Sequence, residues 1–341
     1  MLEKAGIVNV TRRQLIAAWW LGALAGFATP LTGCAKSASA VEQRSATTFN
    51  FDTVCTIAGV MSQEVLDEAC ALCERFEKLL SRTIATSDVG RINAAAGEAV
   101  EVDPLTAELI VSALGYCEES EGLFDITIGA VSELWDFTEG VVPSEEAIAQ
   151  ALPHVGWRNV QVKGSTVRLL DPDARIDLGG IAKGYIADAL VDLLAERGVT
   201  SASVNLGGNV CVLGNKPDGS PWSVGVRDPD DSSGSSVIAK VPLSGGSVVT
   251  SGLYERSFES GGRRYWHILD PHTGYPVETD LISATIVSER SIDGDGYTKP
   301  LFMWGSDEAL RRLSRKPELQ VLLVTADGEP LMTPNASFEL V

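Results

Sequence analysis

The sequence predicts an α+β fold in which mixed sheets are flanked by helices. Segments with the alternating pattern of strands outnumber segments with helical spacing, and the two kinds mix irregularly along the chain. With 341 residues, of which 45% are hydrophobic, the chain can build a large core, as one large domain or as two lobes. The 33 glycines indicate many tight turns between these segments.

The chain opens with the features of an export signal. Arg12 and Arg13 belong to a basic start, and the apolar stretch 15–28 that follows is too short to span a bilayer comfortably. The sequence LTGC at 31–34 resembles the lipobox of bacterial lipoproteins. That resemblance implies cleavage before Cys34 and attachment of lipid to its sulfur; a plain signal anchor is the alternative.

These features divide the chain into three predicted parts. They are a signal peptide at 1–33, a flexible tether at 34–48, whose residues are mostly small and polar, and one domain at 49–341. A lipidated Cys34 would hold that domain at the cell membrane, facing the outside of the cytoplasm. The sequence TRRQL at 11–15 also resembles a twin-arginine signal, which suits a protein that folds around a cofactor before export.

The charge of the chain bears on its partners. There are 46 Asp and Glu residues against 27 Lys and Arg residues, so the net charge is -19 at pH 7. Nucleic-acid phosphates attract basic surfaces, so we expect no nucleic acid among the partners of this protein.

The cysteines do not form the even, dense pattern of a disulfide framework. Of the six cysteines, five remain once Cys34 is assigned to lipidation. Cys70 and Cys73 form a CxxC spacing, but they lie inside a helical pattern and no second pair accompanies them. We interpret these thiols as small buried apolar residues, with redox or metal-binding roles as the minor alternative.

Helices and strands are predicted from their hydrophobic periods. Helices are expected at 63–80, at 104–118, after the caps Ser87 or Asp88, and from the turn at 293–304. Strands are expected at 49–58, 160–170 (a hairpin), 202–213 (interrupted by Gly207-Gly208), 222–226, 281–287 and 321–326, and a polar hairpin at 247–258 with 265–276.

The stretch 175–198, RIDLGGIAKGYIADALVDLLAERG, organises the chain. A short apolar strand turns on Gly179-Gly180 and continues as a helix that Gly198 ends. The first turn of a helix has unpaired N–H groups and partial positive charge, and glycines let a phosphate approach that backbone. From spacing alone, an anion site and a turn that only solves a packing problem are equally good interpretations.

Two more segments contain residues that could do chemistry. His267 stands near Asp270 in HILDPHTG, and a histidine close to a carboxylate is a usable general base, although the alternating pattern also fits a buried His267. Asp295 stands in DGDG, which fails the calcium-loop pattern but satisfies the sparse demand of a magnesium site.

Taken together, these motifs resemble the ApbE family of FAD:protein FMN transferases. The matching motifs, in the family's order, are FDT from 51, LS from 80, GLFDIT from 122, IDLGGIAKGYIAD from 176, NLGGN from 205, VGVRDP from 224, TSGLYER from 250, HILDPHTGYP from 267 and DGYTKPLF from 295. They cover almost everything after residue 49.

The resemblance implies an activity. Members of the family bind FAD with Mg²⁺ and transfer its FMN half to a Thr or Ser hydroxyl of a target protein, releasing AMP, so flavinylation of exported electron-transfer proteins is expected. It also implies two lobes of one domain with the flavin site between them. The residues that it implies for FAD binding are Phe51, Thr83, Leu123, Phe124, Asp125, Asp177, Lys183 and Ile268.

The resemblance places Mg²⁺ on the Gly180 carbonyl, on Asp295, which is thereby also a catalytic residue, and on the position of Lys299. His267 is the expected base and Asp270 its orienter. Lys299 departs from the family, which usually has Thr there: a protonated lysine cannot bind a cation. A water or Thr298 could take that place, or Lys299 could neutralise pyrophosphate charge.

Other departures leave alternatives open. Thr83 stands where the family often has an aromatic stacking partner, so stacking on the flavin is expected to be weaker. The first alternative activity is a Mg²⁺-dependent FAD pyrophosphatase that gives FMN and AMP, because it needs the same site with water as acceptor. The second is a flavin-binding lipoprotein without catalysis.

Overall fold

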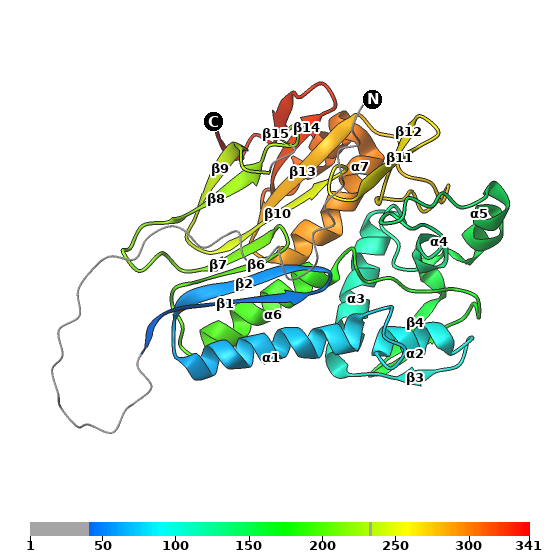
Figure 1. Ribbon diagram of the computed structural model, residues 1–341, viewed down its shortest axis with the longest axis horizontal. Coiled ribbons are helices and arrows are strands. Elements are labelled where there is room, and N and C mark those ends of the chain that lie inside the picture. The colour runs from blue at the N-terminus through cyan, green and yellow to red at the C-terminus, as the bar shows by residue number, and fades with distance from the viewer. Residues whose placement is uncertain (1–40, 232–233) are drawn as a thin grey trace, which may run out of the picture. The chain divides into compact units, whose positions relative to one another are not determined.

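The computed structural model of the protein describes residues 41–231 and 234–341 (Figure 1). One compact unit spans residues 39–341. It combines helices with several antiparallel sheets, so the predicted α+β class is confirmed. The predicted signal peptide and Cys34 lie outside the described residues.

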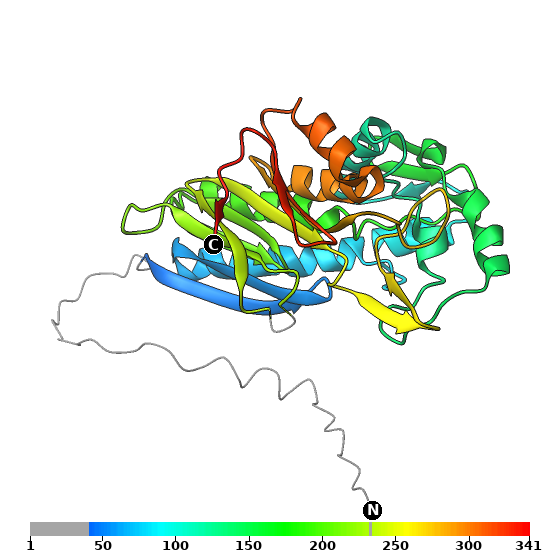
Figure 2. The ribbon, with the colours of Figure 1, turned by 90° about the horizontal axis from the view of Figure 1, so that it is seen from above.

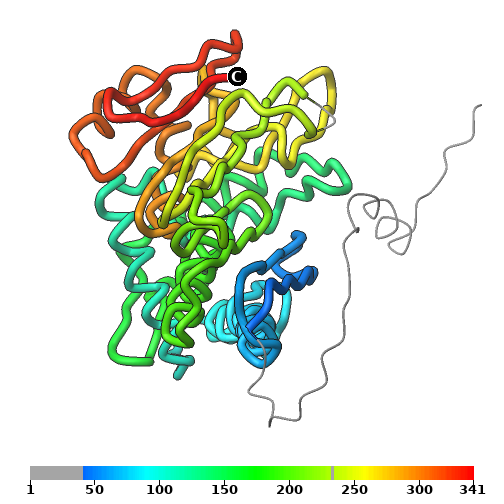
Figure 3. Tube along the Cα trace, turned by 90° about the vertical axis from the view of Figure 1, so that its left-hand side faces the viewer, coloured from blue at the N-terminus to red at the C-terminus, as the bar shows by residue number. Residues whose placement is uncertain are grey.

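The largest sheet has eight strands in the order β1-β2-β6-β7-β10-β13-β14-β15, and all neighbours are antiparallel. Its strands are β1 (Glu42–Asn50), β2 (Thr53–Met61), β6 (Ala202–Leu206), β7 (Asn209–Leu213), β10 (Gly246–Gly252), β13 (Leu281–Ser288), β14 (Gln320–Thr325) and β15 (Pro330–Met332). Figure 3 shows the blue β1–β2 hairpin and the red strands β14 and β15 at opposite edges of the sheet.

Three long helices cover one face of this sheet. Helix α1 (Gln63–Leu80) packs under β1 and β2, α6 (Ala182–Glu196) under β6 and β7, and α7 (Ser291–Leu313) under β10 and β13 (Figure 1). The other face is partly covered by a small sheet of β8 (Trp222–Arg227), β9 (Val237–Leu243) and β16 (Glu339–Leu340). Successive side chains of β13 point to opposite faces of the sheet. Ile286 therefore packs with α7 on one face, whereas Val287 packs with β8 and β9 on the other.

A smaller lobe is built between α1 and α6. It contains α2 (Asp88–Ala94), α3 (Pro104–Glu119), α4 (Gly129–Ser132), α5 (Glu145–Ala151), the short 3₁₀ helices η2 (Leu152–His154) and η3 (Trp157–Asn159), and a sheet of β3 (Val100–Glu101), β5 (Thr166–Leu169) and β4 (Val160–Lys163). Its apolar side chains join those of α1 and α6 in one continuous core, whereas α7 packs on β13 and β14 in a separate core.

The hairpin of β11 (Ser257–Ser260) and β12 (Arg263–Trp266) leaves the main sheet and lies beside the segment with α4 and α5 (Figures 1 and 2). Tilted aromatic pairs hold it there: the ring of Phe258 contacts Phe137, and that of Tyr265 contacts Trp135. The predicted hairpin of 247–258 with 265–276 is therefore only partly correct. Strands β11 and β12 pair with each other, but the first predicted residues belong to β10 of the main sheet.

The predicted tether was wrong beyond its first residues. Residues 42–48 belong to β1, which pairs along its whole length with β2. The predicted strand 49–58 is likewise a hairpin, because the chain turns at Phe51 and Asp52, both of which have left-handed backbone angles (φ 55° and 56°). Such angles are uncommon away from glycine, and this turn contains none, so the glycine signal of a hairpin turn is absent.

The interpretation of the cysteines is confirmed for the described residues. All five of them there are free thiols, four are buried and Cys70 is partly buried. Burial raises the pKa of Cys73 and of Cys211 to about 12, so neither is a thiolate at neutral pH.

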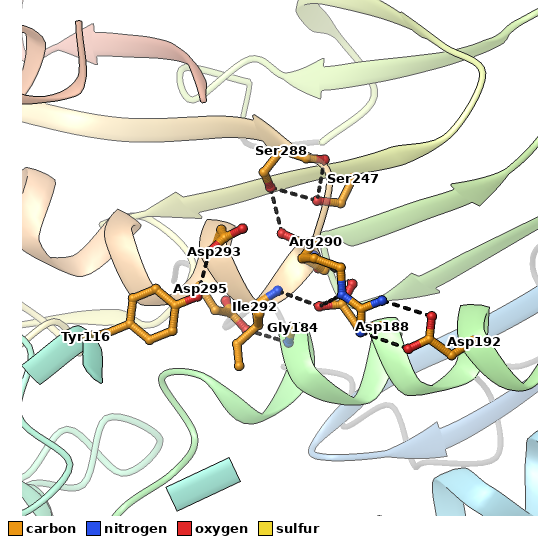
Figure 4. Close-up of polar contacts among 11 residues, drawn as sticks. Tyr116, Gly184, Asp188, Asp192, Ser247, Ser288, Arg290, Ile292, Asp293 and Asp295 are labelled. Atoms are coloured by element: carbon orange, nitrogen blue, oxygen red, sulfur yellow. Dashed lines mark hydrogen bonds and ion pairs between the residues drawn. The ribbon is translucent and has the colours of Figure 1, made fainter. Parts of the chain in front are cut away.

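Helices α6 and α7 cross closely at a glycine. A Cβ atom on Gly184 would stand 2.6 Å from the Ser291 carbonyl oxygen and 2.7 Å from Ile292 Cα. The Asp188 carboxylate accepts hydrogen bonds from the backbone N–H groups of Ser291 (2.7 Å) and Ile292 (3.0 Å) and so caps α7 from the neighbouring helix (Figure 4). This crossing fixes the first turns of α7 against the first turns of α6.

We expect Gly184→Ala to lower the free energy of unfolding by about 1–3 kcal/mol, because the added methyl group would push α7 away from α6. Gly115→Ala on α3 is the matched control, since nothing lies within 4 Å of a Cβ atom there. The control should raise the stability by about 0.5–1 kcal/mol through helix propensity. Urea unfolding followed by circular dichroism measures both; equal effects would contradict the close crossing.

Candidate active site

The α6–α7 crossing brings Asp295 to the start of α6. Asp295 lies in the second turn of α7 and is 1% exposed. Its Oδ2 accepts a hydrogen bond from the backbone N–H of Gly184 at 2.7 Å (Figure 4). The carboxylate therefore uses one of the N–H groups in the first turn of α6 that lack a partner within that helix.

The glycines of DGDG serve packing rather than calcium binding. A Cβ atom on Gly294 would stand 2.4 Å from a methyl carbon of Val249 on β10, and one on Gly296 would stand 2.4 Å from the Tyr116 ring. Asp293 accepts a hydrogen bond from the Tyr116 hydroxyl at 2.6 Å. The motif is helical from its first residue, so only Asp295 faces α6.

Lys299, one helical turn after Asp295, fills the space beside it. Its Nζ lies 3.2 Å from Asp295 Oδ1 and 3.3 Å from the Asp295 carbonyl oxygen. A Cβ atom on Gly180 would lie 3.7 Å from Lys299 Cε and 3.2 Å from the Phe124 ring. The Gly180 turn therefore lies next to both side chains, and Lys299 links it to Asp295. Burial raises the pKa of Asp295, but the charges of Lys299 and Lys183 outweigh it and leave this pKa below its ordinary value.

The three residues that the sequence assigns to a metal ion are thus together, but they do not all fit one. The Gly180 carbonyl and the Asp295 carboxylate are suitable oxygen ligands. The third position holds an ammonium group that already donates to Asp295. Thr298, the alternative ligand, is fully buried and accepts a hydrogen bond from Ser251 on β10 at 3.0 Å.

Lys183 adds a second positive charge. It lies in the first turn of α6, directly after the Gly179-Gly180 turn, and its Nζ donates to Asn209 Oδ1 at 2.7 Å. At the N-terminus of α6 the Gly184 N–H donates to Asp295 and the Ala182 N–H donates to the Leu178 carbonyl, while the N-cap residue Ile181 makes no side-chain bond. The positive end of the helix dipole beside two lysines favours an anion over the simple packing turn.

His267 lies near these cations. Its backbone N–H donates to the Arg256 carbonyl at 3.1 Å, and its Nδ1 is buried without a hydrogen-bond partner among the described residues. Burial, followed by the charges of Lys299 and Arg256, lowers the pKa of His267 to about 4. The imidazole is therefore neutral at pH 7, as a general base must be.

The predicted role of Asp270 as the orienter of His267 was wrong. Asp270 Oδ1 accepts from the backbone N–H of His272 at 2.8 Å and lies 3.3 Å from His272 Nδ1. Asp270 begins a tight turn in which its own N–H donates to the Tyr275 carbonyl at 2.8 Å. Proximity in sequence suggested the pair with His267, but this turn directs the carboxylate to the histidine that follows it.

The GLFDIT segment supplies a second part of the site. Phe124 packs against the Gly179-Gly180 turn, as its contact with Gly180 indicates. Asp125 is buried, and its carboxylate accepts from Thr127 Oγ1 (2.6 Å) and from the Trp157 backbone N–H (3.0 Å). Burial outweighs these bonds and raises the pKa of Asp125.

The remaining predicted residues fall into three places. Asp177 Oδ2 accepts from Ser132 Oγ at 3.1 Å and lies 3.4 Å from Arg82 Nε, next to the exposed Thr83. Phe51 lies at the strained turn of the β1–β2 hairpin. Leu123 and Ile268 flank residues already described, Phe124 and His267.

Sequence reasoning missed Asn209, Ser251 and Arg256 as site residues. Asn209 ends the NLGGN motif and positions Lys183, whereas Ser251 and Arg256 belong to TSGLYER. These motifs had been recognised without roles, and the sheet register that places them beside α7 is a tertiary property.

A groove of ≈ 470 Å³ lies where the β1–β2 turn, the smaller lobe and the segment before β11 meet. It is lined by Phe49, Asp52, Phe137, Thr138, Tyr254, Glu255, Arg256 and Ser257. One of these residues, Arg256, accepts the backbone hydrogen bond of His267 through its carbonyl.

Comparisons with known proteins identify one family. The sequence model of the ApbE family matches residues 51–323. A Treponema pallidum protein named FAD:protein FMN transferase is 36% identical over 280 residues, which are 77% of this chain and 77% of that protein. A Klebsiella pneumoniae protein of the same name is 36% identical over 277 residues, which are 78% of this chain and 85% of that protein.

Solved structures give the same result. The ApbE protein of Thermotoga maritima superposes with a TM-score of 0.78 at 33% identity, covering 86% of this chain and 97% of that one. The flavinyl transferase ApbE of Pseudomonas stutzeri, in its apo form, superposes with a TM-score of 0.76 at 28% identity, covering 86% and 96%.

We expect the His267 imidazole to titrate near pH 4 in nuclear magnetic resonance spectra, and Arg256→Gln to raise this pKa because a nearby cation is removed. The chain has 3 histidines, so the spectrum of His267→Gln identifies the signal. Arg158→Gln, whose charge is not among those acting on His267, is the control. A pKa at or above 6.5 in the unmodified protein would contradict the buried, cation-flanked environment.

Proposed function

The chain belongs to the ApbE family, and we propose that it transfers the FMN half of FAD to a Thr or Ser hydroxyl of an acceptor protein, releasing AMP. One observation carries the proposal: two lysines and the N-terminus of α6 surround a buried carboxylate beside a neutral histidine. That set provides an anion site for a pyrophosphate and a base for a hydroxyl, which are the two requirements of phosphoryl transfer.

In this proposal, each part of FAD contacts a different group of the residues described above. The pyrophosphate lies at the N-terminus of α6, where Lys183 and Lys299 balance its charge. The rings contact Phe124 and Phe51, together with Leu123 and Ile268. Polar contacts to the flavin and ribityl groups come from Thr83, Asp125 and Asp177.

The reaction is a displacement at the phosphorus of the FMN half. The acceptor oxygen forms a bond to that phosphorus while the bond to the AMP oxygen breaks, and the electron pair leaves with AMP. The hydroxyl proton passes to the neutral His267. Positioning and charge neutralisation supply most of the catalysis, since phosphoryl transfer needs little covalent assistance.

Magnesium is the cofactor that the family resemblance implies. Here it would find two of its three expected ligands, the Gly180 carbonyl and Asp295, because an ammonium group stands in the third position. No step of the proposed reaction passes through a metal ion.

We expect His267→Ala to bind FAD about as well as the unmodified protein but to label the acceptor ~10²–10⁴-fold more slowly, the usual contribution of a general base. Flavin fluorescence of the denatured acceptor measures transfer, and titration of FAD measures binding. His272→Ala is the matched control, since that histidine is exposed and pairs with Asp270.

Three outcomes would change the assignment. Equal loss of binding and transfer in His267→Ala would give His267 a binding or folding role. Release of FMN and AMP without a labelled acceptor would make the protein an FAD pyrophosphatase. Binding of FAD without turnover would make it a flavin-binding protein.

We also propose that the mature chain begins at a lipidated Cys34 and is held at the membrane, on the outside of the cytoplasm. The sequence LTGC behind a short apolar segment supports this proposal. Within the described residues, none of the helices has the length and apolarity that crossing a bilayer requires. β1 begins at Glu42, so the link between Cys34 and the domain is short.

Cys34→Ser should move the protein from the membrane fraction to the soluble fraction or leave it unprocessed, because each buried CH₂ of an acyl chain contributes about 0.8 kcal/mol to anchoring. Cell fractionation with an immunoblot measures both location and size. Cys70→Ser, at a thiol on α1, is the control. Mature-sized Cys34→Ser protein found wholly in the membrane would contradict the proposal.

A further inference from the structure

We propose that the Lys299 ammonium replaces the divalent cation in this site, so that the pyrophosphate is neutralised by protein side chains alone. This inference rests on the proposed function and concerns how the same site supplies positive charge.

The ammonium group occupies the place that a cation would take. It lies within 3.3 Å of two oxygens of Asp295, the carboxylate Oδ1 and the backbone carbonyl. Its stem adjoins Gly180, whose carbonyl is the other oxygen ligand that the sequence suggests. The lysine side chain is 19% exposed and that of Asp295 is 2% exposed, so water screens this pair little.

Both oxygens of the Asp295 carboxylate already have donors. Oδ2 accepts from the Gly184 N–H at 2.7 Å, and Oδ1 faces the ammonium at 3.2 Å. A divalent ion bound to Oδ1 would lie next to the ammonium group, and two positive charges so close together repel strongly in a buried site. Removing the ammonium instead would break a buried ion pair and leave the Asp295 charge without its partner.

Neither neighbour offers a replacement ligand. The Thr298 hydroxyl accepts from Ser251 and lies on the side of α7 that packs on β10. Asp293, on the preceding turn, accepts from the Tyr116 hydroxyl instead of facing α6 (Figure 4). Among the described residues of α7, Asp295 is thus the one carboxylate at this position, and its partner is Lys299.

The chemical consequence is a fixed pair of ammonium groups from two helices. Lys183 comes from the first turn of α6 and Lys299 from α7, and both act on Asp295. Each can donate to a phosphate oxygen as a compact point charge. Because both are covalently part of the chain, neither group has to be captured from solution before FAD arrives.

The first test measures metal binding without turnover. Flavin-free protein is titrated with Mn²⁺, and bound ion is followed by electron paramagnetic resonance. We expect the unmodified protein to bind no more Mn²⁺ than the double variant Lys299→Thr/Asp295→Asn, whereas Lys299→Thr gains a site. Binding by the unmodified protein that is as tight as in Lys299→Thr and is lost in Asp295→Asn would overturn the inference.

The second test measures FAD cleavage in EDTA. The unmodified protein and Lys299→Arg, which keeps the charge, should retain most of their rate. Lys299→Thr should lose about 10²-fold or more, as when one stabilising donor is removed, and added Mg²⁺ should restore it. Complete loss of the unmodified protein's rate in EDTA, with recovery in Mg²⁺, would overturn the inference. If the unmodified protein leaves FAD intact in both conditions, the proposed function fails, and the Mn²⁺ titration still decides the role of Lys299.

Discussion

The close contact between α6 and α7 is the constraint on which the site depends. Gly184 has no side chain, so the two helices approach until two carboxylates reach across: Asp188 to the first amides of α7, and Asp295 to the Gly184 amide. These bonds satisfy helix ends that would otherwise be buried without partners. They also set the register of α7, and with it the position of Lys299 beside the Gly179-Gly180 turn.

Positive charge then determines the behaviour of the neighbouring groups. Lys183 and Lys299 face one carboxylate, Asp295, so the region is cationic before any ligand binds. Burial, together with the charges of Lys299, Arg256 and Lys183, lowers the pKa of His267 and holds its imidazole neutral. A bound pyrophosphate would offset them and make the imidazole more basic at the moment when the acceptor proton must be removed. Substrate binding and base strength are therefore coupled through the lysines.

The sequence predicted much of this arrangement because its signals are local. The glycine turn and helix around Gly180 and the α7 position of Asp295 follow from period and turn chemistry within short windows. The short strand predicted before that turn was wrong, because only an isolated bridge between Arg175 and Ile128 forms there. The edge strand β1 was missed, since its polar residues carry no hydrophobic period and its turn at Phe51 and Asp52 contains no glycine. The pairing of Asp270 with His272 was missed because a backbone turn, invisible in composition, directs the carboxylate.

Lys299 illustrates a further limit of sequence reasoning. Its position in the motif suggests a missing oxygen ligand, whereas its contacts assign it a charge of its own in the site. A divalent ion concentrates more charge and can polarise a phosphoryl oxygen directly, but it must be captured from solution. An ammonium group supplies a weaker field that is already oriented when the substrate binds, and such preorganisation limits the reorganisation that charge stabilisation requires. The buried Asp295 carboxylate then acts chiefly as the anchor that holds this ammonium group toward the pyrophosphate.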